Sequence, residues 1–434
     1  MITYKEYCTC RKPYQELGFL MLLERKHACL FYKPGKGKTY PTIDAIRDVD
    51  KSKNGNAKVL ILSTASAIKM MWMEDIVPQN ILPKNTVLMS FTKAVQEETK
   101  RRLLSVKWDV IVIDESHHIK SHNSKISKLV FNLTKKCEYA FGLTGTPRGN
   151  SDIDIYCQFH NLNISSWGEI NYTAFTETCC DIDKKFFNGA MIKVPIGINE
   201  RYRAGFLRNV AMYSQFVDYD DDDKMPDMEI EEVKIPFTPS KEYLLAEEGV
   251  IKLTDYETTL TKLAAICKLQ QLANGYLYVT DEGDESKRRT IQITHNNKVE
   301  WMRDNLKVEH SLVVYRNQEE CNQLRNILSM YFGENCYTDD ITTFKKGNHK
   351  VLLLQCSQSE SFNLQMCSNV IFYTMDYSFI NFDQMLHRVY RMGQKDKVKI
   401  QILINENSVE QKIWNAVNNK RTLSELFYSI KGEL

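Results

Sequence analysis

Several features are missing from this chain of 434 residues, and each absence excludes a class of protein. No apolar run approaches the roughly 18 residues that a membrane-spanning helix needs, so we expect no membrane segment. The opening residues, MITYKEYCTCRK, hold no apolar core of a secretory signal, and the twelve cysteines form no CxxC pair of the kind that binds structural zinc. We therefore expect a cytoplasmic protein with reduced thiols.

An excess of charge of one sign is also lacking. The chain has 57 Lys and Arg against 55 Asp and Glu, a net charge of +2, so it lacks the bulk basic character that coats nucleic acid. Any nucleic-acid partner must therefore be held by a local groove. With 43% hydrophobic residues the chain can bury large cores, and its length allows two or three domains of roughly 150 residues.

Short apolar runs, each followed by polar or helix-forming sequence, recur in two parts of the chain. This rhythm is typical of βαβ units, because strands covered by helices on both faces are apolar throughout. The sequence therefore predicts an α/β fold with two parallel-sheet lobes. The expected strands of the first lobe are 28–32, 58–63, 86–91, 109–115 and 139–146, and those of the second are 311–315, 350–355, 369–374 and 398–404.

Between the two lobes the rhythm is lost. Residues 150–235 are aromatic and polar, with an acidic run at Asp218 and 220–223 that we interpret as a solvated loop. A helical stretch is expected over 241–276, followed by a charged loop at 281–289. The predicted parts are a first lobe over 1–150, an insert with a linker and a helical segment over 151–290, and a second lobe over 291–434.

The sequence PGKGKT at 34–39 lies between an expected strand and an expected helix, which is the context of a phosphate-binding loop. Its glycines let backbone N–H groups turn toward phosphate oxygens, and the start of the next helix favours negative charge. Lys38 is placed to reach the outer phosphates and Thr39 to bind magnesium. The full GxxxxGK[ST] pattern is not met, because Tyr32 holds the first glycine position, and a chance surface turn is the alternative. The expected nucleotide-binding residues are Gly35, Lys36, Gly37, Lys38 and Thr39.

An acidic motif, DESH at 114–117, closes an apolar run. Carboxylates at the end of a buried strand are costly unless they meet a cation. We expect Asp114 to hold magnesium through water and Glu115 to orient and deprotonate the attacking water, with a helix-capping strand end as the alternative. LTGTP at 143–147 ends another expected strand, where its hydroxyl groups are placed to relay between the nucleotide and a second ligand, unless it is a simple exit turn.

A fourth motif, QMLHRVYRMGQ at 384–394, lies in the second lobe. At helical spacing, Gln384, Arg388 and Arg391 fall on one face. Arginines on such a face suit an arginine finger, which stabilises charge on a γ-phosphate and is worth roughly 10³–10⁵ in rate. A solvated basic face is the commoner alternative.

Taken together, these motifs resemble those of the superfamily-two helicases and translocases, and more closely their Swi/Snf branch, over nearly the whole chain. The most branch-specific features are the RxGQ ending at 391–394 and the Ile-Lys and Ser-Lys pairs that follow DESH. Other stretches that look like family motifs are RKPYQ (11–15), LSTAS (62–66), VLMSF (87–91), HNNKVEWM (295–302), SLVVY (311–315), SESFNLQ (359–365) and NSVEQKI (407–413).

The resemblance implies two tandem RecA-like lobes and a DNA translocase or helicase that uses ATP and magnesium. It implies that Gln15 contacts the adenine base and that Arg388 and Arg391 complete the ATP site when the lobes close. DNA is expected to be bound through its phosphates, without sequence specificity. We expect a monomer, with replication or recombination proteins as candidate partners. The expected DNA contacts are Thr64, Ser90, Lys120 and Asn363.

Three departures from the family pattern are visible. Tyr32 replaces the small residue that usually begins the phosphate loop. Where glycines are usual near 359–365, the chain carries Ser357, Ser359 and Ser361. No histone-reading or additional zinc module is evident, and this compact form is similar to phage and prokaryotic members. The expected cytoplasm is thus that of a bacterial host if the protein is phage-encoded.

Three other functions stay open. The protein could separate strands at forks or migrate branched junctions, using Trp167, Phe186, Phe187 and Tyr202 of the insert as a wedge, although local core packing is the alternative for these aromatic residues. It could be an ATP-switched clamp that recruits a partner to DNA, but an intact Glu115 and two arginines favour hydrolysis. It could also be the motor subunit of a nuclease system whose nuclease is another chain.

Overall fold

The computed structural model describes residues 3–149, 151–187, 190–219, 225–253, 256–260, 262–280, 288–347, 349–358, 363–391 and 393–419. The chain divides into two compact units that meet in the sequence at residues 223 and 224, and each unit is described by itself. Within the described residues, no helix has both the length and the apolar character needed to span a membrane.

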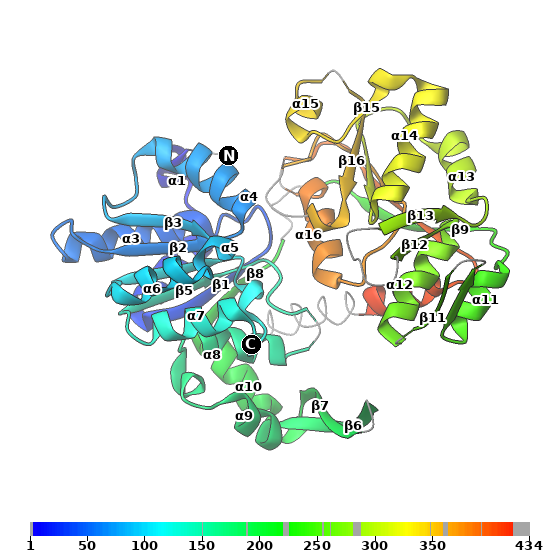
Figure 1. The fold of residues 1–434 in the computed structure, drawn as a ribbon. Coiled ribbons are helices and arrows are strands. Elements are labelled where there is room, and N and C mark those ends of the chain that lie inside the picture. The colour runs from blue at the N-terminus through cyan, green and yellow to red at the C-terminus, as the bar shows by residue number, and fades with distance from the viewer. Residues whose placement is uncertain are drawn as a thin grey trace. The chain divides into compact units, whose positions relative to one another are not determined.

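The first unit is built on a six-stranded sheet in which every described pairing is parallel (Figure 1). Its central strands are buried on both faces, which explains why they read as unbroken apolar runs. The strand order is β3-β2-β4-β5-β1-β8, and a separate antiparallel hairpin pairs β6 with β7. The strands are β1 (His27–Tyr32), β2 (Val59–Ser63), β3 (Thr86–Ser90), β4 (Val110–Asp114), β5 (Tyr139–Leu143), β6 (Cys180–Phe187), β7 (Ala190–Ile198) and β8 (Ser214–Val217).

Alternate residues of this sheet enter two different cores. Ile111 and Ile113 join one cluster of buried side chains, while Val110 and Val112 join another, as the period of two in a strand requires. Both faces are therefore covered. The helical elements of this unit are α1 (Tyr4–Cys10), α2 (Pro13–Arg25), α3 (Thr39–Ser52), α4 (Ala65–Ala67), the π-helix η1 (Ile68–Ile76), η2 (Val77–Gln79), α5 (Phe91–Ala94), α6 (Glu97–Ser105), η3 (Ser116–Ile119), α7 (Lys125–Thr134), α8 (Ile153–Asn161), η4 (Ser165–Gly168), α9 (Tyr172–Cys179) and α10 (Glu200–Tyr213).

The second unit contains another six-stranded parallel sheet, in the order β15-β16-β14-β17-β18-β9, and two antiparallel hairpins. Its strands are β9 (Met228–Ile235), β10 (Val250–Leu253), β11 (Tyr256–Thr259), β12 (Tyr276–Thr280), β13 (Arg288–Gln292), β14 (Ser311–Tyr315), β15 (Tyr337–Thr338), β16 (Val351–Gln355), β17 (Asn369–Phe372) and β18 (Val398–Asn405). Its helices are α11 (Lys241–Glu247), α12 (Lys262–Ala273), α13 (Asn297–Asn305), α14 (Gln318–Phe332), η6 (Glu334–Cys336), α15 (Ile341–Lys345), η7 (Cys356–Gln358) and α16 (Phe379–Val389).

The predicted α/β class with two RecA-like parallel-sheet lobes is confirmed, and all nine expected apolar runs form strands. The segment predicted as an insert over 151–290 is divided between the units, because β8 pairs with β1 and β9 pairs with β18. Both are edge strands, and β9 is half-buried or exposed except at Ile235, so neither gives an apolar run. The stretch expected to be helical over 241–276 is interrupted by the β10–β11 hairpin. Residues 220–223 of the acidic run and 281–287 of the charged loop lie outside the described residues.

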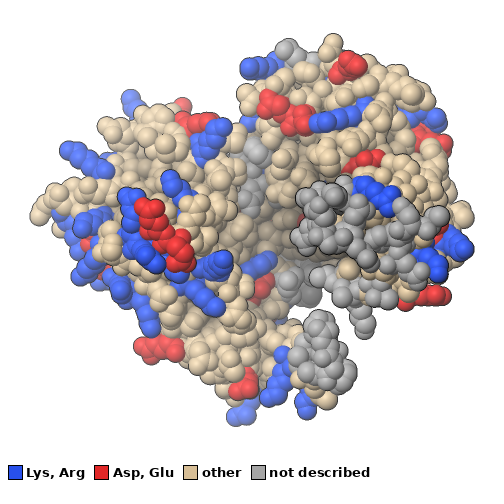
Figure 2. Space-filling view, in the orientation of Figure 1, with Lys and Arg blue, Asp and Glu red and all other residues tan. Residues whose placement is uncertain are grey.

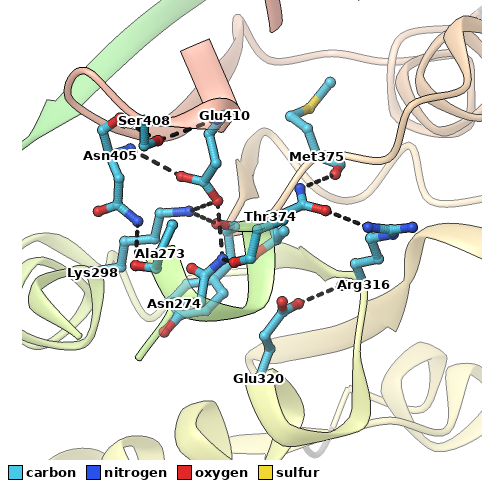
Figure 3. A network of polar contacts seen from close by, with 12 residues as sticks. Ala273, Asn274, Lys298, Arg316, Glu320, Thr374, Met375, Asn405, Ser408 and Glu410 are labelled. Atoms are coloured by element: carbon cyan, nitrogen blue, oxygen red, sulfur yellow. Dashed lines mark hydrogen bonds and ion pairs between the residues drawn. The ribbon is translucent and has the colours of Figure 1, made fainter. Parts of the chain in front are cut away.

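A network of buried polar groups ties the end of the second unit to its core (Figure 3). The fully buried Lys298 ammonium donates to Glu410 Oε1 and to the Tyr373 carbonyl, each at 2.7 Å. Glu410, in the stretch that follows β18, also accepts from the Asn274 side chain and the Asn405 backbone, each at 3.0 Å. The charge of Lys298 is therefore neutralised by a partner that lies more than a hundred residues away in sequence.

We predict that Lys298→Met strongly destabilises the protein. Methionine keeps most of the volume but leaves the Glu410 carboxylate buried without its cation, which typically costs about 3–5 kcal/mol. The measurement is urea denaturation. The matched control is Lys397→Met, which breaks the exposed pair with Glu229 in the same unit and should change the midpoint little. Equal midpoints for the two variants would contradict the structural role of the buried pair.

Candidate functional site

The carboxyl edge of the first sheet gathers the motifs of the first unit. Because the strands are parallel, the segments that follow them emerge at the same edge. β5 lies between β1 and β4, so LTGTP lies between the phosphate loop and DESH. Gly145 of LTGTP packs so closely on Pro34 that a Cβ there would lie 2.9 Å from Pro34 Cδ. Parallel topology alone thus brings these separate stretches of sequence together.

The stretch RKPYQ contacts the phosphate loop through hydrogen bonds to the loop backbone. Gln15 is buried, and its side-chain nitrogen donates to the carbonyl oxygens of Lys36, at 3.2 Å, and Gly37, at 3.3 Å. The Tyr14 hydroxyl also donates to Lys36, at 3.2 Å. Gly35 and Gly37 have φ values of 92° and 72°, which only glycine adopts freely. Gln15 therefore supports the loop, while its predicted contact to the adenine base stays a prediction.

The two lysines of the loop differ in environment. Lys36 is 2% exposed, and its ammonium lies 5.4 Å from the centre of the Tyr14 ring. Lys38 is partly exposed at the N-cap of α3, and its charge acts on Asp114. Lys38 is therefore the better placed of the two to meet a phosphate group.

Tyr32, the departure from the usual loop pattern, has its own place in the fold. Its side chain is fully buried, and its hydroxyl donates to the Tyr14 carbonyl at 3.0 Å and to Gln215 Oε1 at 2.6 Å. Gly18 makes room for it, since a Cβ there would lie 2.1 Å from the Tyr32 hydroxyl oxygen. The Tyr32 side chain thus connects RKPYQ with the edge strand β8 and does not occupy the space of the phosphate loop.

Asp114 is a fully buried carboxylate at the end of β4. Its Oδ2 accepts from the Ser63 hydroxyl at 3.0 Å and from the Trp72 indole N–H at 3.1 Å. Its Oδ1 accepts from the Glu115 backbone N–H at 3.2 Å. Burial raises the pKa of Asp114, as does the neighbouring Glu115 charge, while Lys38 acts in the opposite direction.

Glu115 is connected to LTGTP by a short chain of polar groups. The Thr144 hydroxyl lies 3.5 Å from Glu115 Oε2 and 3.1 Å from His117 Nδ1, and it accepts from the Thr146 backbone at 3.1 Å. Glu115 itself has a φ of 55°, an uncommon conformation for a residue with a side chain and one that clusters at functional sites. The hydroxyl relay expected of LTGTP is thus in contact with the proposed base.

The residues expected to hold magnesium have suitable chemistry. Thr39 and Asp114 supply oxygen atoms, which hard cations prefer, and magnesium in nucleotide sites takes few protein ligands besides phosphate oxygens and water. The Thr39 hydroxyl lies 3.9 Å from the Met71 sulfur, a weak acceptor. Within the described ranges, no group of three or more His, Cys, Asp or Glu could hold a metal by itself.

Two of the expected DNA contacts lie at the ends of neighbouring strands. Ser63 pairs with Ser90 in the β2–β3 register, so Thr64 and Ser90 start adjacent helical turns. Each hydroxyl accepts from a backbone N–H of its own turn, Thr64 from Ala67 and Ser90 from Lys93. A hydroxyl that accepts a capping bond retains a proton to donate to phosphate. The third expected contact, Lys120, is half-buried in the turn that follows Asp114.

The arginine motif of the second unit differs from the expected single helical face. α16 ends at Val389, so Arg391 lies beyond the helix, and Gln384 is buried while Arg388 and Arg391 are half-exposed. Gln394 folds back to cap this helix end, donating to the Cys367 carbonyl at 2.9 Å and to the Val389 carbonyl at 3.3 Å. The prediction that these three side chains share a helical face is therefore wrong.

The same region positions the last expected DNA contact. Leu364, which follows Asn363, donates its N–H to the Arg388 carbonyl at 3.0 Å, so SESFNLQ and HRVYRMGQ are joined through their backbones. Residues 359–362, including Ser359 and Ser361, and Met392 lie outside the described residues. Ser357 lies in η7.

The insert aromatic residues considered as a wedge belong in part to the core. Trp167 is 9% exposed and stacks on Phe206 with ring centres 5.0 Å apart. Tyr202 packs against the same buried cluster. Packing is therefore the role of these two residues. The side chains of Phe186 and Phe187 lie outside the described part of the structure.

Comparison with known proteins finds one matching family model and several similar proteins. The SNF2-related domain family matches residues 77–185. A Bacillus subtilis protein named uncharacterized ATP-dependent helicase YqhH is 23% identical over 430 residues, which cover 87% of this chain and 71% of that protein. The Drosophila melanogaster SWI/SNF-related matrix-associated actin-dependent regulator of chromatin subfamily A-like protein 1 is 23% identical over 446 residues, covering 94% of this chain and 55% of its own length.

A solved structure described as the Sulfolobus solfataricus SWI2/SNF2 ATPase core in complex with dsDNA is also similar. It aligns with a TM-score of 0.42 and 21% identity, and covers 96% of this chain and 93% of the other.

We predict that Gly145→Ala weakens nucleotide binding several-fold. The added Cβ would press on Pro34 and on the Tyr32 carbonyl, both at the base of the phosphate loop, and so displace the loop. The measurement is isothermal calorimetry with ADP and magnesium. The control is Gly205→Ala on α10, where a Cβ meets no atom within 4 Å, and its affinity should match that of the wild type. Unchanged affinity in Gly145→Ala would count against the contact between the two loops as a determinant of nucleotide binding.

Proposed function

The chain belongs to the Swi/Snf-like branch of the superfamily-two helicases, and on that premise we propose that it is a DNA-dependent ATPase that couples ATP hydrolysis to movement along a DNA backbone. One observation carries the proposal. Lys38, Asp114 and Glu115 lie at one edge of a parallel sheet, and a hydroxyl relay connects Glu115 to the next loop. Nucleotide hydrolysis needs this combination of a phosphate-binding lysine, a cation-binding carboxylate and a base.

We assign the proposed roles residue by residue. The loop 35–39 binds the phosphates through backbone N–H groups and Lys38, and Thr39 and Asp114 hold magnesium. When bound, magnesium neutralises charge on the phosphate oxygens. Glu115 orients the attacking water and accepts its proton, with its side chain held near Thr144. Arg388 and Arg391 of the second unit are the proposed stabilisers of charge on the γ-phosphate.

DNA is the proposed track, bound through its phosphates. Thr64, Ser90 and Lys120 of the first unit, with Asn363 of the second, are the proposed backbone contacts. Figure 2 shows Lys and Arg side chains gathered on the first unit, over the region that carries α5, α6 and α7. This supports a local basic surface on a chain whose net charge is only +2. The exposed basic residues of this region are Lys93, Arg101, Arg102, Lys107, Lys125, Lys128, Lys135 and Lys136.

A motor fits the residues better than an ATP-switched clamp does. A clamp needs nucleotide binding but no fast hydrolysis, whereas this site places Glu115 in a conformation that clusters at functional sites and connects it to Thr144. Two of the aromatic residues considered as a fork-unwinding wedge serve packing instead. Trp167 is buried, and Tyr202 packs against the same buried cluster.

The function is tested by measuring ATP hydrolysis without nucleic acid and with single-stranded, duplex and forked DNA and RNA. We expect duplex DNA to stimulate the wild type in a salt-sensitive, sequence-independent way. Lys38→Ala should reduce the stimulated rate to background, because the outer phosphates lose their cation. Lys53→Ala, at the other end of the same helix, is the control and should keep the rate. An undiminished rate in Lys38→Ala, or no stimulation of the wild type by any DNA, would refute the assignment.

We predict a different defect for Arg391→Ala. If this arginine acts on the γ-phosphate in the transition state, its loss should lower the hydrolysis rate by about 10³-fold or more and leave ATP affinity close to that of the wild type. Single-turnover hydrolysis and equilibrium ATP binding measure the two quantities. Arg303→Ala, on the exposed face of α13, is the control for loss of an arginine from the same unit. Weakened ATP binding with normal turnover of the bound fraction would contradict the finger role.

A further inference from the structure

One short segment supplies both side-chain donors to Asp114. Ser63 closes β2, and Trp72 lies nine positions later in the π-helix η1. The two donate to the same oxygen, Asp114 Oδ2, at 3.0 and 3.1 Å. The Trp72 side chain is fully buried, and with its N–H used in this way it can make no other strong hydrogen bond. No motif of the sequence analysis includes Trp72.

The same segment carries the proposed DNA contact. Thr64 follows Ser63 directly, and it caps the turn that leads into η1 by accepting from Ala67 N at 3.3 Å and Ile68 N at 3.0 Å. One residue before Trp72, the Met71 sulfur lies 3.9 Å from the Thr39 hydroxyl. Thr64, a proposed DNA contact, therefore caps the short helix α4 that leads directly into η1. Two successive side chains of η1, Met71 and Trp72, contact the two residues proposed to hold magnesium.

The geometry of η1 suits a segment that shifts. A π-helix is rare, and its i→i+5 turns are frequently found at functional sites. Its cap here runs from Val77 N to the Trp72 carbonyl, so the tryptophan backbone belongs to this widened stretch. Because α4 and η1 form one continuous helical stretch, a displacement of its cap at Thr64 would be transmitted along that stretch to the indole N–H of Trp72.

We propose that Trp72 is a positioning residue that fixes the Asp114 carboxylate and couples DNA engagement at Thr64 to the magnesium side of the ATP site. The inference rests on the proposed function. The two donors on Oδ2 restrain the orientation of the carboxylate, and Oδ1 keeps only the bond from Glu115 N at 3.2 Å, so Oδ1 would be the oxygen left to face a cation. Without the indole N–H, the carboxylate loses one of its two side-chain restraints.

The test compares Trp72→Phe with a matched control, Trp108→Phe. Both variants keep an aromatic ring in the core of the first unit and remove one buried indole N–H, but Trp108 donates to the Leu103 carbonyl, away from Asp114. ADP affinity is measured by calorimetry with magnesium and with EDTA. ATP hydrolysis is measured with and without duplex DNA.

In Trp72→Phe, we expect the gain in ADP affinity that magnesium confers to fall about tenfold, as is typical for loss of a hydrogen bond to a charged group. The affinity in EDTA should match that of the wild type. Stimulation of hydrolysis by DNA should fall by a similar factor, and Trp108→Phe should retain both effects. If Trp72→Phe does not fold, Ser63→Ala removes the other donor with little change in volume and should give the same pattern.

Two results would overturn the inference. One is a Trp72→Phe variant whose magnesium effect equals that of Trp108→Phe. The other is a weakened magnesium effect with undiminished DNA stimulation, which would remove the coupling to Thr64. Failure of the proposed function itself has a different signature, because the wild type would then show no DNA-stimulated hydrolysis at all.

Discussion

The burial of the Asp114 carboxylate is the constraint on which the first unit depends. A charged group taken out of water must be satisfied by donors and by opposite charge, or it destabilises the fold. Here the donors are Ser63 and Trp72 and the charge is that of Lys38. Together with Asp114, these groups come from three separate segments, which follow or end parallel strands of one sheet and so meet at one edge. The donors and the positive charge that stabilise the buried Asp114 carboxylate therefore also fix its orientation at the edge where we propose that a cation binds.

Much of this fold could be predicted from the sequence, because central strands of a parallel sheet are buried on both faces and read as apolar runs. All nine predicted runs form strands. What escaped prediction lies at the edges. β9, with the sequence MEIEEVKI, is only half-buried or exposed before Ile235, so its charged residues conceal its pairing with β18 from a search for apolar runs. The division of the insert between two sheets follows from these edge strands, and pairing between distant segments is not encoded in local periodicity.

The candidate site shows a similar limit. Motifs such as PGKGKT and DESH place chemistry-bearing residues at strand ends, and parallel topology then brings them together. Contacts that arise only from three-dimensional packing left no recognisable motif in the sequence. Trp72 lies in an apolar stretch where tryptophan suggests only core packing, and Arg391 shares helical spacing with Arg388 although α16 ends before it. The Tyr32 departure became interpretable only with Gly18, whose missing side chain makes room for the hydroxyl.

The two units differ in how they hold buried charge, and this difference bears on how a motor could use them. In the second unit, Lys298 and Glu410 neutralise each other, and Glu320 accepts from the Arg316 and Asn317 backbones at 2.8 and 3.0 Å, so these charges are satisfied within one body. Such a network favours a single packing arrangement. In the first unit, Asp114 accepts from Trp72 of the π-helix η1, which follows the short helix α4 that Thr64 caps. Coupling between sites needs an element with two accessible arrangements, and the proposed coupling assigns that part to η1, which joins the Thr64 cap to the donor of Asp114.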